Sequence, residues 1–145
     1  MNKLNILLAD DDTDDCLFFQ QALSALAEPV NFSAVYDGEQ LMQLLMHETV
    51  QLPDILFLDL NMPRKNGFEC LTEIKKQERL KGLPVVIFST SGAHEHMSIL
   101  FKTGANVYIR KPDNLAQLVQ VIQHAFPMAT EKLFSNGRLK YILNA

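Results

Sequence analysis

Five short runs rich in apolar residues recur along the chain, and each is typical of a strand. They cover residues 4–9, 30–35, 55–58, 83–88 and 106–109. The third run, from Ile55 to Leu58, is wholly apolar, which is typical of a strand buried on both faces. Because an ionised carboxylate deep in a core is expensive, we expect Asp59 to lie where this strand emerges, at its carboxyl end.

Helical periodicity fills the intervals between the runs. Apolar residues recur at spacings of three and four around residues 16–26, 41–48, 68–82, 94–102 and 115–126, and Gly104 is expected to cap the fourth of these helices. Strands that alternate with helices predict an α/β fold, a parallel sheet with helices on both faces. Right-handed crossovers restrict the topology to a doubly wound form.

The C-terminal residues are less regular. Asn136-Gly137 is a hairpin-type turn signal, and apolar residues flank it on both sides. We expect a small hairpin or an added helix that packs on its own domain or on a second subunit. Nineteen residues are too few for an effector domain, so the expected organisation is one domain over residues 1–126 and an extension over residues 127–145.

Composition narrows the functional classes. The 145 residues are 48% hydrophobic and 21% charged, as in an ordinary globular domain. The net charge is −4 and no basic stripe is present, which argues against nucleic acid as the main partner. The sequence shows no signal-peptide pattern and no apolar run of membrane-spanning length, so we expect a cytoplasmic protein with no membrane partner. Cys16 and Cys70 lack metal-binding spacing and are expected to be reduced, buried thiols.

The chemistry-bearing residues lie at the expected strand ends. The first strand delivers Asp10 and Asp11, the third Asp59, the fourth Ser89 and the fifth Lys111. In a parallel sheet these ends share one edge, where ligands bind in open α/β folds. Clustered carboxylates repel one another unless a cation joins them, and their hard oxygens suit Mg²⁺. An ammonium, a hydroxyl and a carboxylate nucleophile beside Mg²⁺ fit phosphoryl transfer to Asp59.

Other polar residues have simpler interpretations. We assign Asp12, Asp14 and Asp15 to a solvated first turn of the first helix, where carboxylates suit the helix dipole. His94 and His96 are spaced by two at a helix start, so they point in different directions and are expected to face solvent.

Four segments together resemble a response-regulator receiver domain of bacterial two-component signalling, over about residues 3–126. They are LLADDD (residues 7–12), LDLNMP (58–63, with Gly67), VIFST (86–90) and YIRKP (108–112). The third strand and its loop are similar to small stand-alone regulators, some paired with phytochrome-type kinases. The resemblance implies a flavodoxin-like, doubly wound sheet of five parallel strands in the order 2-1-3-4-5.

The resemblance also implies roles for single residues. Asp59 matches the phosphoacceptor that attacks the phosphohistidine of a sensor kinase or phosphotransfer protein. The Mg²⁺ ligands would be Asp11, Asp59 and the backbone carbonyl of Asn61, with Asp10 holding the metal through water. Lys111 matches the residue that pairs with the phosphorylated aspartate.

Two further residues match the family's switch. Ser89 would move to the phosphoryl group and Tyr108 would turn inward, which changes the face of the fourth helix, fifth strand and fifth helix. The chain would then be a phosphoacceptor that assists its own phosphorylation and dephosphorylation rather than an enzyme. A downstream protein target and a homodimer are the other partners implied. Ser89 stands where threonine is commoner, and Asn61 and Ser91 occupy positions that tune dephosphorylation.

Three alternatives remain at this point. A phosphatase of the haloacid dehalogenase type would need an acid two residues after its nucleophile, where this chain has Asn61. A flavin mononucleotide binder would place phosphate in the first loop, where three aspartates would repel it. A degenerate receiver would serve only for binding or dimerisation, although all five core groups are present here.

Overall fold

Parallel strands form a single sheet in this computed structural model, which describes residues 3–47, 51–90, 99–100, 102–105, 107–130 and 140–142. The order is β2-β1-β3-β4-β5-β6, and every adjacent pair is parallel. The first five strands confirm the predicted 2-1-3-4-5 doubly wound order. The strand bounds are β1 Leu4–Ala9, β2 Val30–Val35, β3 Ile55–Leu58, β4 Val85–Ser89, β5 Val107–Arg110 and β6 Lys140–Ile142.

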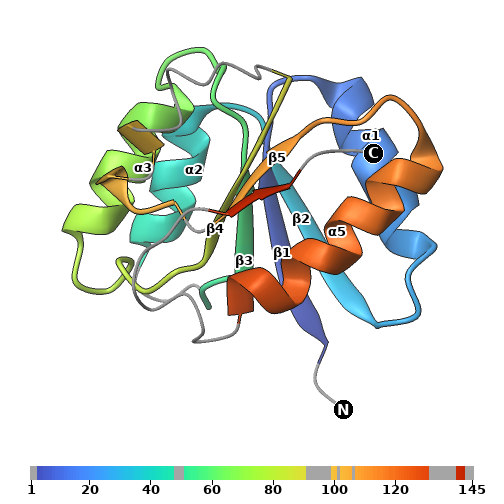
Figure 1. The fold of residues 1–145 in the computed structure, drawn as a ribbon. Coiled ribbons are helices and arrows are strands. Elements are labelled where there is room, and N and C mark those ends of the chain that lie inside the picture. The colour runs from blue at the N-terminus through green and yellow to red at the C-terminus, as the bar shows by residue number, and fades with distance from the viewer. Residues whose placement is uncertain are drawn as a thin grey trace.

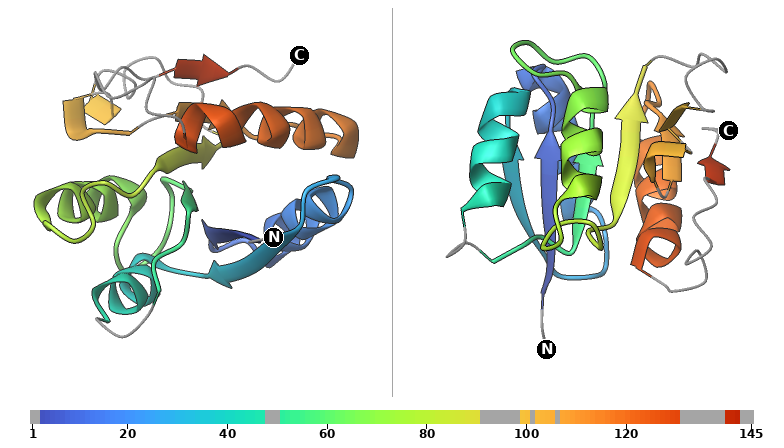
Figure 2. Two further views of the ribbon diagram at one scale, coloured as in Figure 1. Left: turned by 90° about the horizontal axis from the view of Figure 1, so that it is seen from below. Right: turned by 90° about the vertical axis from the view of Figure 1, so that its left-hand side faces the viewer.

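Helices cover both faces of the sheet, as predicted. Helices α2 and α3 lie on one face and α1 and α5 on the other (Figures 1 and 2). The predicted helix over residues 94–102 falls largely outside the described residues, as do His94 and His96. Its predicted cap is confirmed, because Gly104 has a φ of 111° and its amide donates to the Leu100 carbonyl. The helix bounds are α1 Thr13–Ser24, α2 Gly38–Met46, α3 Gly67–Lys76 and α5 Leu115–Thr130.

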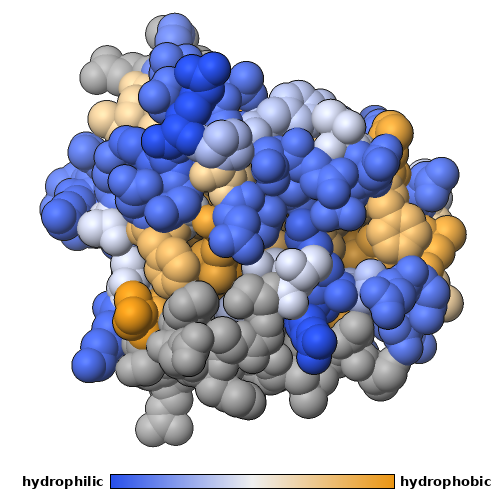
Figure 3. Space-filling view, turned by 90° about the horizontal axis from the view of Figure 1, so that it is seen from above, coloured by the Kyte–Doolittle hydropathy of each residue, from blue (hydrophilic) through white to orange (hydrophobic). Residues whose placement is uncertain are grey.

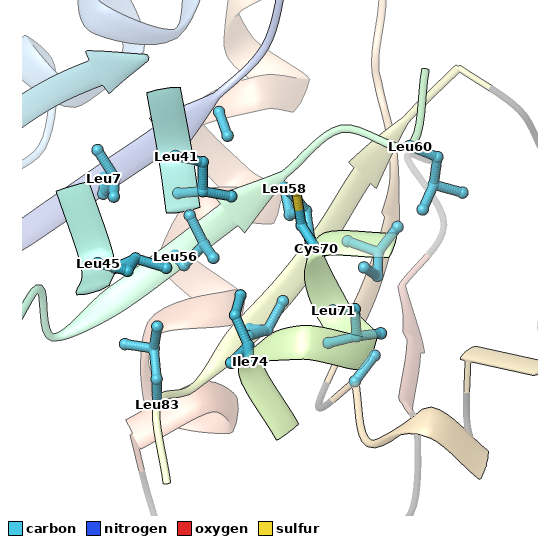
Figure 4. Packing of buried hydrophobic residues seen from close by; sticks show 14 of the residues in the cluster. Leu7, Leu41, Leu45, Leu56, Leu58, Leu60, Cys70, Leu71, Ile74 and Leu83 are labelled. Carbon is cyan, nitrogen blue, oxygen red and sulfur yellow. The ribbon is translucent and has the colours of Figure 1, made fainter. Parts of the chain in front are cut away.

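Two apolar clusters hold these layers together. All four residues of β3 are buried, and their side chains alternate between the clusters. Leu56 and Leu58 pack toward α2 and α3, where they meet leucines and Ile74 (Figure 4). On the other face Phe57 lies edge-on to Phe19 of α1, with ring centroids 4.9 Å apart. A strand apolar at every position is therefore required by burial on both sides.

The register of the strands aligns their carboxyl ends. Ala9 pairs with Val35 on one side and Leu58 on the other, and the Asp59 amide donates to the Ala9 carbonyl at 2.9 Å. Where β4 and β5 end, the Lys111 amide donates to the Ser89 carbonyl at 3.0 Å. Backbone pairing therefore carries the polar residues after each strand to one edge of the sheet.

The structure differs from the sequence expectations at element ends. Helix α3 ends at Lys76 rather than near Gly82, because Gln77 is extended and its carbonyl accepts the amides of a following turn. Helix α5 continues past Pro127 to Thr130. Residues 140–142 of the tail form β6, a strand that pairs with β5 in parallel, which the expectation of a small hairpin or an added helix did not include. The Asn136-Gly137 turn signal lies outside the described residues.

Candidate functional site

The predicted residues converge at the carboxyl ends of the strands. Asp10 and Asp11 follow β1, and Asp59 follows β3. One carboxylate oxygen from each of these three aspartates lies within 4.8 Å of the others. Asp10 and Asp59 are buried while Asp11 is exposed, so the cluster is open to solvent on one side. The sequence prediction that these three carboxylates meet is confirmed by this geometry.

Lys111 lies at the centre of the acidic residues. Its Nζ donates to Asp10 Oδ2 at 2.7 Å and to Asp15 Oδ2 at 2.9 Å. Asp59 Oδ2 is 3.6 Å away, which is an ion pair at a distance too long for a hydrogen bond. The ammonium also lies 5.5 Å from the centroid of the Phe88 ring, within the range of a cation–π contact. Lys111 thus contacts residues that lie in or directly after β1, α1, β3 and β4.

Asp15 is the site residue that the sequence prediction missed. It was assigned with Asp12 and Asp14 to a solvated helix start, and for Asp12 the structure agrees, since this residue is the N-cap of α1. Asp15 instead pairs with Lys111. A signal was present, because Asp15 lies four residues before buried Phe19 and so faces the protein on the same side of the helix.

Burial and neighbouring charges have opposing effects on the pKa values of the aspartates and the lysine in this site. Burial is the largest cause that raises the pKa of Asp59, Lys111 opposes it, and the neighbouring Asp10 adds to it, with the net result that the pKa is raised to about 6. Burial likewise raises the pKa of Asp10 against the opposing hydrogen bond from Lys111. Burial lowers the pKa of Lys111, but its hydrogen bonds to Asp10 and Asp15 outweigh this and raise it above the usual range. Lys111 therefore stays an ammonium at neutral pH.

The donor set suits a hard divalent cation. Three carboxylates pair with the Lys111 ammonium, and Asp11 adds a fourth carboxylate to the cluster, so the described site carries excess negative charge when all are ionised. Asp10, Asp11 and Asp59 offer only oxygen ligands, and their partly open arrangement leaves room for water and a substrate oxygen, as Mg²⁺ sites do. The Asn61 amide approaches Asp59 Oδ1 at 3.5 Å. The role of its carbonyl as a ligand stays a prediction.

Ser89 and Tyr108, the predicted switch residues, are both buried. Ser89 ends β4 beside the site, and its side chain is inaccessible to solvent. Tyr108 lies in the middle of β5, opposite Ile87 of β4, and belongs to the cluster under α2 and α3. Their movement on phosphorylation remains a prediction.

The loop after Asp59 is held closely against the sheet. Asn66 and Glu69 form a capping box at the start of α3, and the Gly67 amide donates to the Leu60 carbonyl at 2.9 Å. A Cβ atom on Gly67 would lie 2.3 Å from the Asp59 carbonyl oxygen. Only glycine fits there without displacing the residue that carries the candidate nucleophile.

The face of the molecule on which the strands end is largely hydrophilic. Figure 3 views the molecule from above, the side on which the strands end, and blue side chains cover most of the coloured area. Among the helices of the described residues, none combines the length and apolar character needed to cross a membrane.

Known proteins are similar to this chain in sequence and in fold. The chain is similar to the response regulator Rcp1 of Synechocystis sp., at 32% identity over 122 residues that cover 81% of this chain and 83% of Rcp1. The structure of the phosphorylated cyanobacterial phytochrome response regulator RcpA superposes with a TM-score of 0.80 at 32% identity, covering 90% of this chain and 96% of that one. A Mn²⁺-bound form of Rcp1 superposes with a TM-score of 0.78 at 30% identity, covering 90% and 96%.

The family comparison covers most of the chain. Residues 6–123 match the response regulator receiver domain, a span that includes Asp10, Asp11, Asp59, Ser89 and Lys111. The same five residues lie together in the structure at the ends of four strands. The chain belongs to the response regulator receiver domain family.

Proposed function

We propose that Asp59 accepts a phosphoryl group from the phosphohistidine of a sensor histidine kinase or a phosphotransfer protein, in a reaction that requires Mg²⁺. The observation that carries this proposal is the position of the Asp59 carboxylate, which shares a cluster with Asp10 and Asp11 and lies 3.6 Å from the Lys111 ammonium. A carboxylate nucleophile with a cation and an ammonium beside it matches the needs of phosphoryl transfer.

The residues around Asp59 each have a part in this transfer. An Asp59 oxygen attacks phosphorus as the bond from phosphorus to the histidine nitrogen breaks, and the histidine leaves as neutral imidazole once protonated. Asp10, Asp11 and Asp59 would hold the Mg²⁺, which neutralises phosphoryl charge when bound. Lys111 supplies a second, permanent positive charge for a phosphoryl oxygen. Catalysis is then mostly positioning and charge neutralisation.

Phosphorylation of Asp59 would change the conformation of residues in β4 and β5. Ser89 lies at the end of β4 beside the site, and Tyr108 is a buried neighbour on β5. We infer that Ser89 bonds the phosphoryl group and that Tyr108 responds, altering the face formed by the fourth helix, β5 and α5. That face would bind a downstream protein target or a second copy of the chain, and nucleic acid and membranes have no part in the proposal.

The relatives support this assignment of function. RcpA has been seen phosphorylated and Rcp1 with Mn²⁺, and both are about 30% identical to this chain. A phytochrome-type kinase is therefore the first candidate donor to test. We place the reaction in the cytoplasm, and we propose residues 1–126 as the receiver and residues 127–145 as an extension to it.

Incubation with acetyl phosphate and Mg²⁺, followed by intact mass spectrometry, tests the proposal. The wild type should gain one phosphoryl group, and it should gain none when a chelator removes the metal. Asp59→Asn should gain none, while Asp54→Asn, exposed at the opposite end of β3, should behave as wild type. An unchanged wild-type mass would indicate a module used only for binding, and steady hydrolysis of small phosphate esters would indicate a phosphatase.

A further inference from the structure

Lys111 has three anionic partners that differ in burial. The Asp10 side chain is inaccessible and the Asp59 side chain is 8% exposed, whereas that of Asp15 is 37% exposed. Asp10 and Asp59 also belong to the cluster of candidate metal ligands, and Asp15 does not. A cation bound by this cluster would therefore be shared by Asp10 and Asp59, whereas Asp15 would not be one of its ligands.

The three partners also differ in what their release would cost. Separating Lys111 from Asp10 would leave a buried carboxylate without its ammonium, which is strongly unfavourable. The Asp15 side chain is partly exposed, so water can solvate its carboxylate when Lys111 moves away. Ion pairs with an exposed partner contribute little to stability, so the loss of this pair costs little free energy. The contact with Asp15 is thus the one that Lys111 can exchange most readily.

The distances show which way Asp15 draws the ammonium. Nζ is 2.9 Å from Asp15 Oδ2 but 3.6 Å from Asp59 Oδ2. Lys111 is hydrogen-bonded to α1 and β1 and stands off from the carboxylate that would carry the phosphoryl group. Asp10 and Asp15 take two of the three ammonium donors, so a phosphoryl oxygen that draws Nζ toward Asp59 competes with the hydrogen bond to Asp15 for the position of the ammonium.

We propose that Asp15 is a positioning residue that holds Lys111 on the α1 side of the site, and that a phosphoryl group on Asp59 displaces it. This inference rests on the proposed function of Asp59. The exchange releases Asp15 from Lys111, so the contact between the first turn of α1 and the β5–α5 connection depends on phosphorylation. Asp15 competes with the phosphoryl group, and its removal favours the phosphorylated arrangement.

Three variants separate this role from general effects of charge. Asp15→Asn removes the charge and keeps the shape, and Asp15→Glu keeps the charge. Asp14→Asn removes the same charge from an exposed neighbour on the same helical turn. The probe is the beryllofluoride anion with saturating Mg²⁺, which forms a phosphoryl-like adduct on a carboxylate. Its affinity is measured by NMR from the backbone amide signals of residues 59–61.

We expect Asp15→Asn to bind beryllofluoride about three- to fivefold more tightly than wild type, the size of one partly exposed ion pair. Asp14→Asn and Asp15→Glu should bind as wild type does. Damage to the fold would weaken binding, so tightening cannot arise from instability. Unchanged or weaker binding by Asp15→Asn, or equal tightening in either of the other variants, would overturn the proposal. Wild type that binds no beryllofluoride, or Asp59→Asn that binds it equally, would instead refute the function of Asp59.

Discussion

At the scale of single residues, one lysine offsets a group of carboxylates. Lys111 is 9% exposed and pairs with Asp10, Asp15 and Asp59, two of which are buried. Buried charges are tolerated only when paired, so this ammonium and a divalent cation can substitute for one another in part. The stability of the protein should therefore depend on the metal most strongly when the lysine is missing.

Lys111→Met tests this substitution of charges, because it removes the ammonium and keeps an unbranched apolar side chain. In the absence of metal we expect the free energy of unfolding to fall by about 3 kcal/mol, because Asp10 is left unpaired. Added Mg²⁺ should restore more stability to the variant than to wild type. Urea unfolding with and without Mg²⁺ measures both effects, and Lys81→Met, an exposed lysine paired with Glu78, is the control. An equal response to Mg²⁺ in all three proteins would contradict the prediction.

A second residue-scale prediction concerns Cys70, a fully buried residue of α3 whose thiol contacts the Gly38 carbonyl of α2. Burial raises the pKa of its thiol to about 12 from an ordinary value near 9. The folded protein holds this proton more tightly than the unfolded chain, so the resulting stability is complete below pH 9. It is lost as the pH rises from 9 toward 12.

Comparison with Cys70→Ala isolates this effect. The variant should be less stable than wild type at pH 8, because a buried side chain is truncated. At pH 10 the difference should shrink by about 1 kcal/mol, since only wild type bears the cost of keeping this thiol protonated. Other groups titrate equally in both proteins, so their contributions cancel in the difference. Urea unfolding at the two pH values measures it, and a constant difference would show that the thiol ionises in the folded state as it does in the unfolded chain.

How well the sequence predicts the position of a site residue depends on the element that carries the residue. Asp10, Asp59, Ser89 and Lys111 could be placed together because each lies at or directly after the end of an apolar strand, and parallel strands end on one edge. Asp15 is held by a helix, and its partner is 96 positions away. Helical spacing shows which side Asp15 faces, but it does not show what it meets there.

At the scale of elements, close packing of the β3–α3 loop fixes the position of Asp59. Gly67 begins α3, and an added Cβ would come within 2.3 Å of the Asp59 carbonyl oxygen. A backbone atom cannot move aside as the tip of a side chain can. We therefore expect any larger residue at position 67 to push the loop away from the sheet and to shift Asp59 with it.

Gly67→Ala should lower the free energy of unfolding by about 1–3 kcal/mol, the usual cost of overpacking. It should also slow the transfer from acetyl phosphate, because small displacements of a nucleophile cost much of its reactivity. Gly82→Ala is the matched control, since a Cβ there would meet nothing within 4 Å. Urea unfolding and the initial rate of mass gain measure the two effects. Normal rates in Gly67→Ala would show that the loop adjusts without moving Asp59.

Element ends were predicted less well than element interiors. The strands and helices themselves follow from apolar spacing, which burial imposes along the whole element. The end of α3 at Lys76 instead depends on the Gln77 carbonyl, which accepts the amides of Leu80 and Lys81 in a local turn. Several backbone conformations satisfy such groups equally well, so the sequence alone leaves the choice open.

At the scale of the whole molecule, the sheet is extended beyond the predicted five strands. β6 pairs with β5 along Val107, Tyr108 and Ile109, which are all buried. The turn signal in the tail suggested local pairing, whereas the observed partner is about thirty positions earlier in the chain. Long-range pairing depends on which sheet edge is available, and this cannot be read from the spacing of residues in the tail.

Deletion of residues 131–145 tests what β6 contributes. Without β6, the outer edge of β5 would present unpaired backbone groups on an apolar strand, the kind of edge that pairs with another chain. We expect the shortened protein to be less stable to urea and to self-associate as its concentration rises, as sedimentation velocity would show. It should still accept a phosphoryl group on Asp59, because the site lies at the strand ends rather than along this edge. If the shortened protein has wild-type stability and unchanged sedimentation, β6 neither stabilises the fold nor prevents self-association through the edge of β5.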